Sequence, residues 1–170
     1  MLAKLGITRT VHVGGRTKSE LMQALQRNSI MLNASAERLF SCEQFTTSET
    51  RYPLTTVELT VCDLGFPEGA TIAEIYGRVS ELGLALCPLE LGPHLRLQYL
   101  DQPEGQRGSP VRRHQAPYGS ITIASEKLTE DDDFPKGFYL RRIEGVLWLR
   151  GYRSGPEHVW MPDDHFIITR

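Results

Sequence analysis

Apolar and polar residues alternate most regularly between Gly137 and Arg153, in the segment GFYLRRIEGVLWLRGYR. This alternation predicts two antiparallel strands, and Glu144-Gly145 provides a two-residue turn in which glycine takes a positive φ. The turn sets the register of the predicted hairpin, which pairs Ile143 with Val146, Arg141 with Trp148, and Tyr139 with Arg150.

The two faces of this hairpin carry different chemistry, because side chains alternate along a strand. One face combines guanidinium groups with aromatic rings and consists of Tyr139, Arg141, Trp148, Arg150 and Tyr152. We call it the Arg/aromatic face. The opposite face is apolar and consists of Phe138, Leu140, Leu147 and Leu149. Arg142 interrupts the apolar face, so we expect it to find a carboxylate partner or to mark the edge of the sheet.

Helix starts are marked by two TxxE sequences, the spacing of a capping box that satisfies free amide groups. One of them opens a predicted helix over 17–27, and the other opens the clearest helix of the chain, over 71–83. A short helix is predicted after Asn33, with Ala36, Leu39 and Phe40 on its inner side.

Short alternating or β-branched runs predict the remaining strands, which cover 8–13, 54–62, 95–100, 120–125 and 166–169. The polar stretch over 45–50 predicts a linker. Residues 1–50 would then form a helical N-terminal unit, separate or within the same domain, and 51–170 an α+β domain. The expected fold is α+β, with the short helical unit packed beside a mostly antiparallel sheet that carries one main helix.

Composition limits the classes of function. The chain has 170 residues and a formal net charge of −2, which argues against a general nucleic-acid coat and leaves only a local basic site. Its three cysteines lie far apart and form no zinc or disulfide pattern. No apolar run approaches a membrane span and no signal peptide is evident. We therefore expect a cytoplasmic protein that does not enter a membrane.

The Arg/aromatic face is the first candidate site. Guanidinium groups bind phosphate or carboxylate in a planar fork, and aromatic rings stack on nucleic-acid bases. The alternative is structural: Arg141 with Trp148, and Tyr139 with Arg150, would form cross-strand cation–π pairs on a solvated sheet.

The segment over 101–119 is the second candidate. It is polar and locally basic, with Arg107, Arg112, Arg113 and His114 among glycine, proline and glutamine. Such a long loop is suited to fold over a ligand on the hairpin, or to contact a phosphate backbone through Arg112 and Arg113. The alternative is a mobile surface loop without a ligand.

Catalytic and metal sites find less support. Cys87 is followed by Glu90 and His94, but sequence proximity does not place a base beside a thiol, and buried inert cysteine is commoner. The acidic and histidine residues near 130–133 and 158–165 match neither zinc nor calcium spacing. No phosphate loop, nucleophile elbow or dinucleotide fingerprint occurs. We expect no metal and no cofactor.

Two segments carry a resemblance to a known family: LALCPLELGPHLRLQYLDQ over 84–102 and FPKGFYLRRIEGVLWLRGY over 134–152. They resemble a family of small bacterial proteins of uncharacterised function, some of which are labelled helicases. The label requires a phosphate loop, which this chain lacks. The resemblance implies no active-site residues.

The leading hypothesis is a non-catalytic binding module whose Arg/aromatic face recognises an anionic ligand: a nucleotide, a nucleic acid or an acidic protein surface. The alternative is a structural or regulatory protein that acts through a protein partner or by forming a homo-oligomer, with the aromatic residues as interface anchors. A third hypothesis is a small enzyme that works through Cys87, His94 or the C-terminal histidines.

Overall fold

A computed structural model describes residues 6–105 and 119–170 and confirms the α+β fold. The helices are α1 (Lys18–Arg27), α2 (Ala34–Ser41), α3 (Ile72–Glu81) and α4 (Leu91–Gln98). The strands are β1 (Ile7–Val13), β2 (Met31–Leu32), β3 (Tyr52–Thr60), β4 (Ala70–Thr71), β5 (Ile121–Ile123), β6 (Gly137–Ile143), β7 (Val146–Tyr152), β8 (Val159–Trp160) and β9 (His165–Thr169). No helix in these two ranges is long and apolar enough to cross a membrane.

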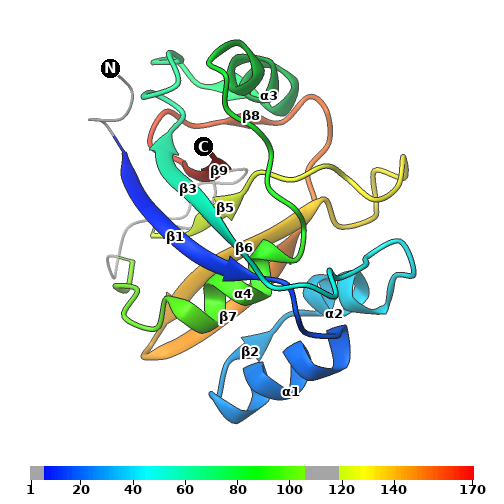
Figure 1. Cartoon of the computed structure of the whole chain (residues 1–170). Coiled ribbons are helices and arrows are strands. Elements are labelled where there is room, and N and C mark those ends of the chain that lie inside the picture. The colour runs from blue at the N-terminus through cyan, green and yellow to red at the C-terminus, as the bar shows by residue number, and fades with distance from the viewer. Residues whose placement is uncertain (1–5, 106–118) are drawn as a thin grey trace.

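Seven strands form one sheet in the order β1-β3-β9-β5-β6-β7-β2, and β4 pairs separately with β8. Neighbours in the large sheet are antiparallel, except that β5 runs parallel to β9 and β2 runs parallel to β7. The C-terminal strand β9 therefore lies inside the sheet, between β3 and β5. Figure 1 shows the sheet between α3 with β8 on one side and α1, α2 and α4 on the other.

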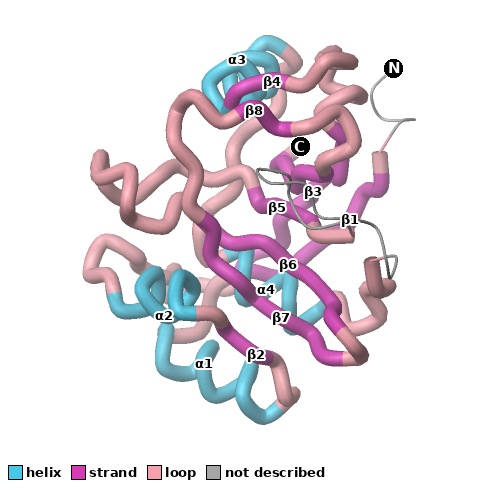
Figure 2. Tube along the Cα trace, turned by 180° about the vertical axis from the view of Figure 1, so that it is seen from behind, coloured by secondary structure: helices cyan, strands magenta, loops and turns pink. Residues whose placement is uncertain are grey.

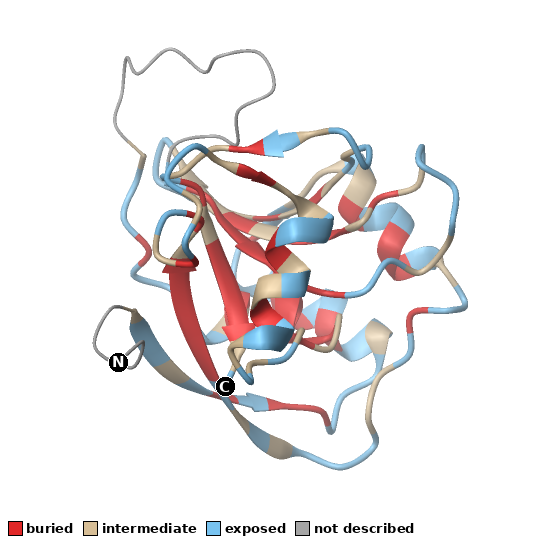
Figure 3. Cartoon of the chain, turned by 90° about the horizontal axis from the view of Figure 1, so that it is seen from above, coloured by how far each residue is buried: buried red, intermediate tan, exposed pale blue. Residues whose placement is uncertain are grey.

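Each face of the sheet has its own apolar core, because successive residues of a strand point to opposite faces. On β9, Ile167 packs with α1, α2 and α4, whereas Phe166 and Ile168 pack with α3 and Trp160. Buried strand residues accordingly run through the middle of the molecule in Figure 3, between exposed outer segments.

The predicted helix starts are confirmed. Both capping boxes are formed: the threonine at each helix start accepts from the glutamate amide, and the glutamate side chain accepts from the threonine amide. Helix α2 begins after Asn33, whose side chain accepts from Ala36 N–H at 2.9 Å. The three residues predicted for its inner side are all buried.

The predicted strand over 95–100 is wrong, because Leu91–Gln98 is the helix α4. Every residue from Leu91 to Arg96 is buried, so these six residues of α4 show no exposed polar face from which a helical period could be recognised. Pro93 lies in its first turn, where the missing N–H costs nothing. The alternation of LRLQYL therefore does not reflect a strand: the polar Arg96 is buried like the apolar Leu95 beside it.

The predicted hairpin is confirmed in its register and turn. Strands β6 and β7 pair as expected, with Tyr139 opposite Arg150 and Leu140 opposite Leu149. Glu144 and Gly145 have φ values of 48° and 80°, as a turn that matches strand twist requires. Figure 2 shows the hairpin with β2 alongside β7.

The N-terminal residues are built into the same sheet as the rest of the described chain. Strand β1 pairs with β3, and β2 pairs with β7. Within the predicted linker over 45–50, Phe45 is buried and its ring lies 6.0 Å from that of Phe138 on the hairpin. The two helices α1 and α2 therefore share one core with the hairpin.

A buried arginine joins α4 to the hairpin. Arg96 has no exposed surface. Its guanidinium donates to Gln102 Oε1 at 2.7 Å, to the Trp148 carbonyl at 3.2 Å, and to the Tyr99 carbonyl. Gln102 is also buried and donates to the Leu140 carbonyl at 3.2 Å. Burial lowers the pKa of Arg96 to about 10, so the group is still charged at neutral pH.

The partner expected for Arg142 is not a carboxylate. Its guanidinium donates to the Gln102 carbonyl at 3.4 Å. Strand β6 lies between β5 and β7, but its pairs with β5 are Tyr139 and Leu140, so Arg142 lies beyond the end of that ladder. A backbone carbonyl after α4 thus accepts the hydrogen bond that we expected a carboxylate to accept from Arg142.

Replacing Arg96 with alanine should lower the free energy of unfolding by about 3 kcal/mol, because three buried oxygens lose their donor. Urea unfolding followed by circular dichroism measures this change. The control is Arg153→Ala, which removes a charge from an exposed position and should alter stability by less than about 0.5 kcal/mol. Equal stability of the two variants would contradict the structural role given to Arg96.

Candidate functional site

The Arg/aromatic face lies on the side of the sheet that carries α3. Tyr152 belongs to the α3 core, but neither Tyr139 nor Trp148 belongs to either core cluster. Tyr139, Arg141, Trp148 and Arg150 are each half-buried. The structure therefore brings four of the five predicted hairpin residues together on a surface outside the cores.

Arg150 lies against both aromatic rings of this surface. Its guanidinium carbon is 4.9 Å from the centroid of the Trp148 ring and 6.0 Å from that of Tyr139. These distances are within the range of cation–π attraction. The cross-strand pair of Tyr139 with Arg150 matches one of the two pairs of the structural alternative. The other pair, Arg141 with Trp148, is not among the cation–π contacts of the described residues, and the contact of Arg150 with Trp148 runs along β7 and was not predicted.

Neither arginine of the Arg/aromatic face forms a salt bridge with a described residue. The Nε atoms of Arg141 and Arg150 are buried and have no hydrogen-bond partner among the described residues. A guanidinium group has five donors and is always charged at neutral pH. The surface thus carries two positive charges that no carboxylate in the described ranges neutralises by direct contact.

The backbone beneath this surface is held from the other side of the sheet. The carbonyl groups of Trp148 and Leu140 accept hydrogen bonds from Arg96 and Gln102. At the turn, Gly145 N–H donates to the carboxylate of Glu104. These bonds fix both strands of the hairpin, so the side chains of the Arg/aromatic face project from a rigid support.

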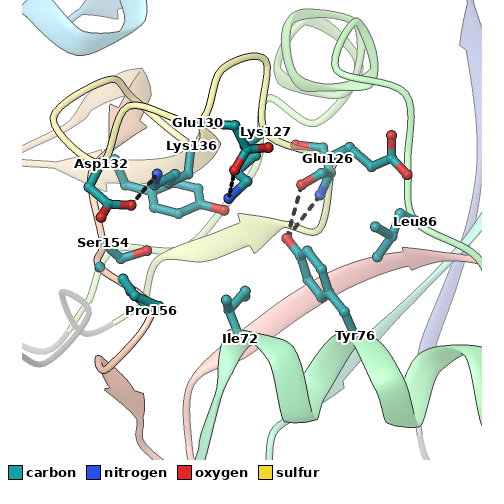
Figure 4. A pocket seen from close by; sticks show the side chains of 13 residues that line it. Ile72, Tyr76, Leu86, Glu126, Lys127, Glu130, Asp132, Lys136, Ser154 and Pro156 are labelled. Carbon is teal, nitrogen blue, oxygen red and sulfur yellow. Dashed lines mark hydrogen bonds and ion pairs between the residues drawn. The ribbon is translucent and has the colours of Figure 1, made fainter.

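Tyr152 has a different role from the other four residues. Its ring meets that of Trp160 edge-on, with centroids 5.7 Å apart. Burial and the neighbouring Tyr76 raise the pKa of Tyr152 well above its usual value. It lines a cavity of about 420 Å³ beside the start of α3, in which the Tyr76 hydroxyl points to the backbone at Ser125, at 3.1 Å from the carbonyl (Figure 4).

The charged residues of this cavity neutralise one another. Lys127 pairs with Glu130 at 2.9 Å, and Lys136 pairs with Asp132 at 3.2 Å (Figure 4). Glu126 adds a further negative charge to the lining. This cavity therefore lacks the positive charge that an anion requires, although Tyr152 connects it to the hairpin.

Arg112 and Arg113 of the second candidate lie outside the described residues, as do Arg107 and His114. Their contribution to a site stays a prediction.

The contacts of Cys87 do not support the thiol hypothesis. Cys87 is buried, and its sulfur lies 3.5 Å from the Ile167 carbonyl and 3.4 Å from Thr169 Oγ1. Burial raises the pKa of this thiol to about 12, so it is protonated at neutral pH. His94 instead accepts from Gly14 N–H at 3.1 Å, and Glu90 accepts from Ser48 N–H at 2.7 Å.

The C-terminal histidine His165 takes part in an ion pair. Its Nδ1 lies 2.9 Å from Glu58 Oε1, and Arg9 donates to the other oxygen of Glu58 at 2.7 Å. The hydrogen bond that His165 donates to the Glu58 carboxylate raises the pKa of His165. Across the described ranges, no three histidine, cysteine or acidic side chains are grouped as metal ligands.

A second group of arginines was missed by the sequence analysis. Arg16, Arg27 and Arg51 line one cavity together with His94. They are far apart in the chain, and only the pairing of β1 with β3 brings two of them to the same place. The one local signal was Gly14-Gly15 directly before Arg16.

Comparisons of the chain with protein-family models, curated proteins and solved structures found no match. The resemblance of two segments to a bacterial family therefore stays a prediction.

Native protein treated with dithionitrobenzoate at pH 8 should leave Cys87 unmodified, because a buried thiol with a pKa of about 12 supplies almost no thiolate. Cys62 is exposed and should react promptly. Mass spectrometry of peptides from the treated protein identifies the modified residues. Modification of Cys87 as fast as Cys62 would show that the thiol is accessible and would restore the thiol hypothesis.

Acidification should destabilise the protein through His94. Burial, with Arg16 and Arg51 nearby, lowers the pKa of His94 to about 4 from 6.5. Between these values the unfolded chain binds a proton that the folded chain does not, so stability falls as pH falls from 6.5 to 4. The variant His94→Gln keeps an acceptor for Gly14 N–H, and its stability should depend less on pH in this window.

Urea unfolding of both proteins at pH 7.5, 6 and 5 tests this expectation. The stability advantage of the natural protein should shrink steadily with decreasing pH. An advantage that is constant over the three conditions would rule out the titration of His94 as its cause.

Proposed function

We propose that this protein is a non-catalytic binding module that recognises an anionic ligand through Tyr139, Arg141, Trp148 and Arg150. One observation carries the proposal: Arg150 lies over two aromatic rings on a rigid hairpin, Arg141 lies opposite Trp148 in the strand pairing, and no described carboxylate forms a salt bridge with either arginine. Charged groups within a fold usually have partners. An anion from outside the chain would supply them here.

The aromatic rings favour a nucleotide or a single-stranded nucleic acid over other anions. Each base has a π-face that stacks on tryptophan or tyrosine, and stacking contributes about 1–3 kcal/mol per base. Arginine binds phosphate oxygens in a planar fork. A surface with both groups matches both parts of a nucleotide, whereas an acidic protein surface would use only the arginines.

A binding site made of only a few residues agrees with the slightly negative charge of the whole chain. A protein with a net charge of −2 gains little from general attraction to phosphates. Binding would therefore depend on the few residues of the Arg/aromatic face and should weaken as salt is added. Because the hairpin backbone is already fixed by Arg96 and Gln102, little ordering would be required when the ligand binds.

The double variant Arg141→Ala/Arg150→Ala should bind fluorescein-labelled single-stranded RNA at least about tenfold more weakly than the natural protein. Fluorescence anisotropy measures the affinity, and a panel of labelled RNA, single-stranded DNA and nucleotide competitors identifies the preferred ligand. The matched control is Arg153→Ala/Arg170→Ala, which removes the same charge from two exposed positions.

The control should bind nearly as well as the natural protein. Binding that survives in Arg141→Ala/Arg150→Ala would clear this face of the proposed role. Equal losses in both double variants would reveal a general charge effect and would also reject the site.

A further inference from the structure

A cavity of about 560 Å³ lies where the end of β1 meets α1 and α4. Its lining includes the guanidinium groups of Arg16, Arg27 and Arg51 and the imidazole of His94. None of the described residues that line it is acidic. The volume is in the range of about 300–1,000 Å³ that is typical of sites for small molecules.

The pairing of β1 with β3 brings two of these arginines together. Val13 lies opposite Tyr52 at the end of the ladder, so the chain segments with Arg16 and Arg51 leave the sheet at the same end. Gly15 N–H then donates to the Ser48 carbonyl at 2.8 Å, which continues the contact beyond the strands.

Two glycines permit this close approach. Gly14 has a φ of +84°, and a Cβ at this position would collide with the Thr50 carbonyl oxygen. Gly15 has a φ of +76°, and a Cβ there would lie 3.3 Å from the Cβ of Arg51. Side chains at either position would separate the two segments. The glycines therefore keep the arginine-bearing loops close together.

His94 adds a neutral donor to the lining. Its Nε2 accepts from Gly14 N–H at 3.1 Å, so the proton of the neutral ring is on Nδ1. No described residue accepts a hydrogen bond from Nδ1. Burial and the charges of Arg16 and Arg51 lower the pKa of His94 to about 4, which keeps the ring neutral at physiological pH.

The positive charges of the cavity are not cancelled by ion pairs with described residues. Arg27 donates to a neutral amide, Gln23 Oε1, at 3.3 Å. Arg16 interacts at longer range with Glu20, whose carboxylate accepts from Thr17 N–H in the capping box. Neither Arg16 nor Arg51 has a described carboxylate within salt-bridge distance.

We propose that this cavity binds the phosphate group of a small phosphorylated molecule. Three guanidinium groups favour an anion with two or more negative charges, and a phosphate monoester or diphosphate carries them. The cavity lies on the side of the sheet that α1 and α4 cover, opposite to the Arg/aromatic face. The two proposals therefore rest on different residues.

Isothermal titration calorimetry with inorganic pyrophosphate tests the proposal on the full chain. The natural protein should bind saturably, with a dissociation constant of about 1 mM or lower. Arg16→Ala and Arg51→Ala should each weaken binding about tenfold. Arg51→Lys keeps the charge without the planar fork, so its affinity for pyrophosphate should lie between those of the natural protein and the alanine variant.

Two controls distinguish binding in this cavity from a general charge effect and from binding on the hairpin. Arg153→Ala removes an equal charge from an exposed position and should change pyrophosphate affinity by less than about twofold. Arg141→Ala/Arg150→Ala should remove only pyrophosphate that binds on the Arg/aromatic face, and the saturable binding that depends on Arg16 and Arg51 should persist in that variant. All variants should show the circular dichroism spectrum of the natural protein, because each altered side chain is at least partly exposed.

Three results would overturn the proposal. One is the absence of saturable binding up to about 10 mM pyrophosphate. Another is an unchanged affinity in folded Arg16→Ala and Arg51→Ala. The third is a loss of pyrophosphate binding in Arg141→Ala/Arg150→Ala alone, which would place the anion on the hairpin instead.

Discussion

A buried guanidinium group connects α4 to the backbone of the hairpin, and the candidate site depends on this connection. Arg96 binds three neutral oxygens and no described carboxylate, so its charge is balanced by carbonyl dipoles alone. A buried charge without such partners is strongly destabilising. The bonds of Arg96 therefore hold the chain after α4 and the backbone of Trp148 in fixed positions relative to each other. The Arg/aromatic face thus rests on a backbone that needs no ligand to hold it in place.

The sheet separates two groups of arginines that form no ion pair with the described residues. On one side, Arg141 and Arg150 lie on the surface of the hairpin, where Arg150 contacts two aromatic rings. On the other side, Arg16, Arg27 and Arg51 line a cavity with a neutral histidine. A protein with a formal net charge of −2 thus concentrates arginines locally. This distribution is what recognition of particular anions requires, and it differs from a surface that attracts all polyanions.

The elements that the sequence predicted correctly are those determined by residues close together in the chain. The hairpin followed from alternation and one turn, and two helices followed from capping boxes that the structure forms. Helix α4 was misread because burial on all sides removes its periodicity. The cavity was missed because its arginines meet only through strand pairing and helix packing. Likewise, the packing of Tyr152 into the α3 core involves Trp160, which follows the hairpin in the chain and gave no signal within it.

Nuclear magnetic resonance of the two tryptophan indole groups tests the central claim most directly. Trp148 lies on the Arg/aromatic face, whereas Trp160 is buried in the α3 core. Titration with single-stranded RNA should shift the indole signal of Trp148 saturably and leave that of Trp160 in place. An unchanged Trp148 signal, whether the RNA binds elsewhere or does not bind, would contradict the assignment of this face as the ligand-binding surface.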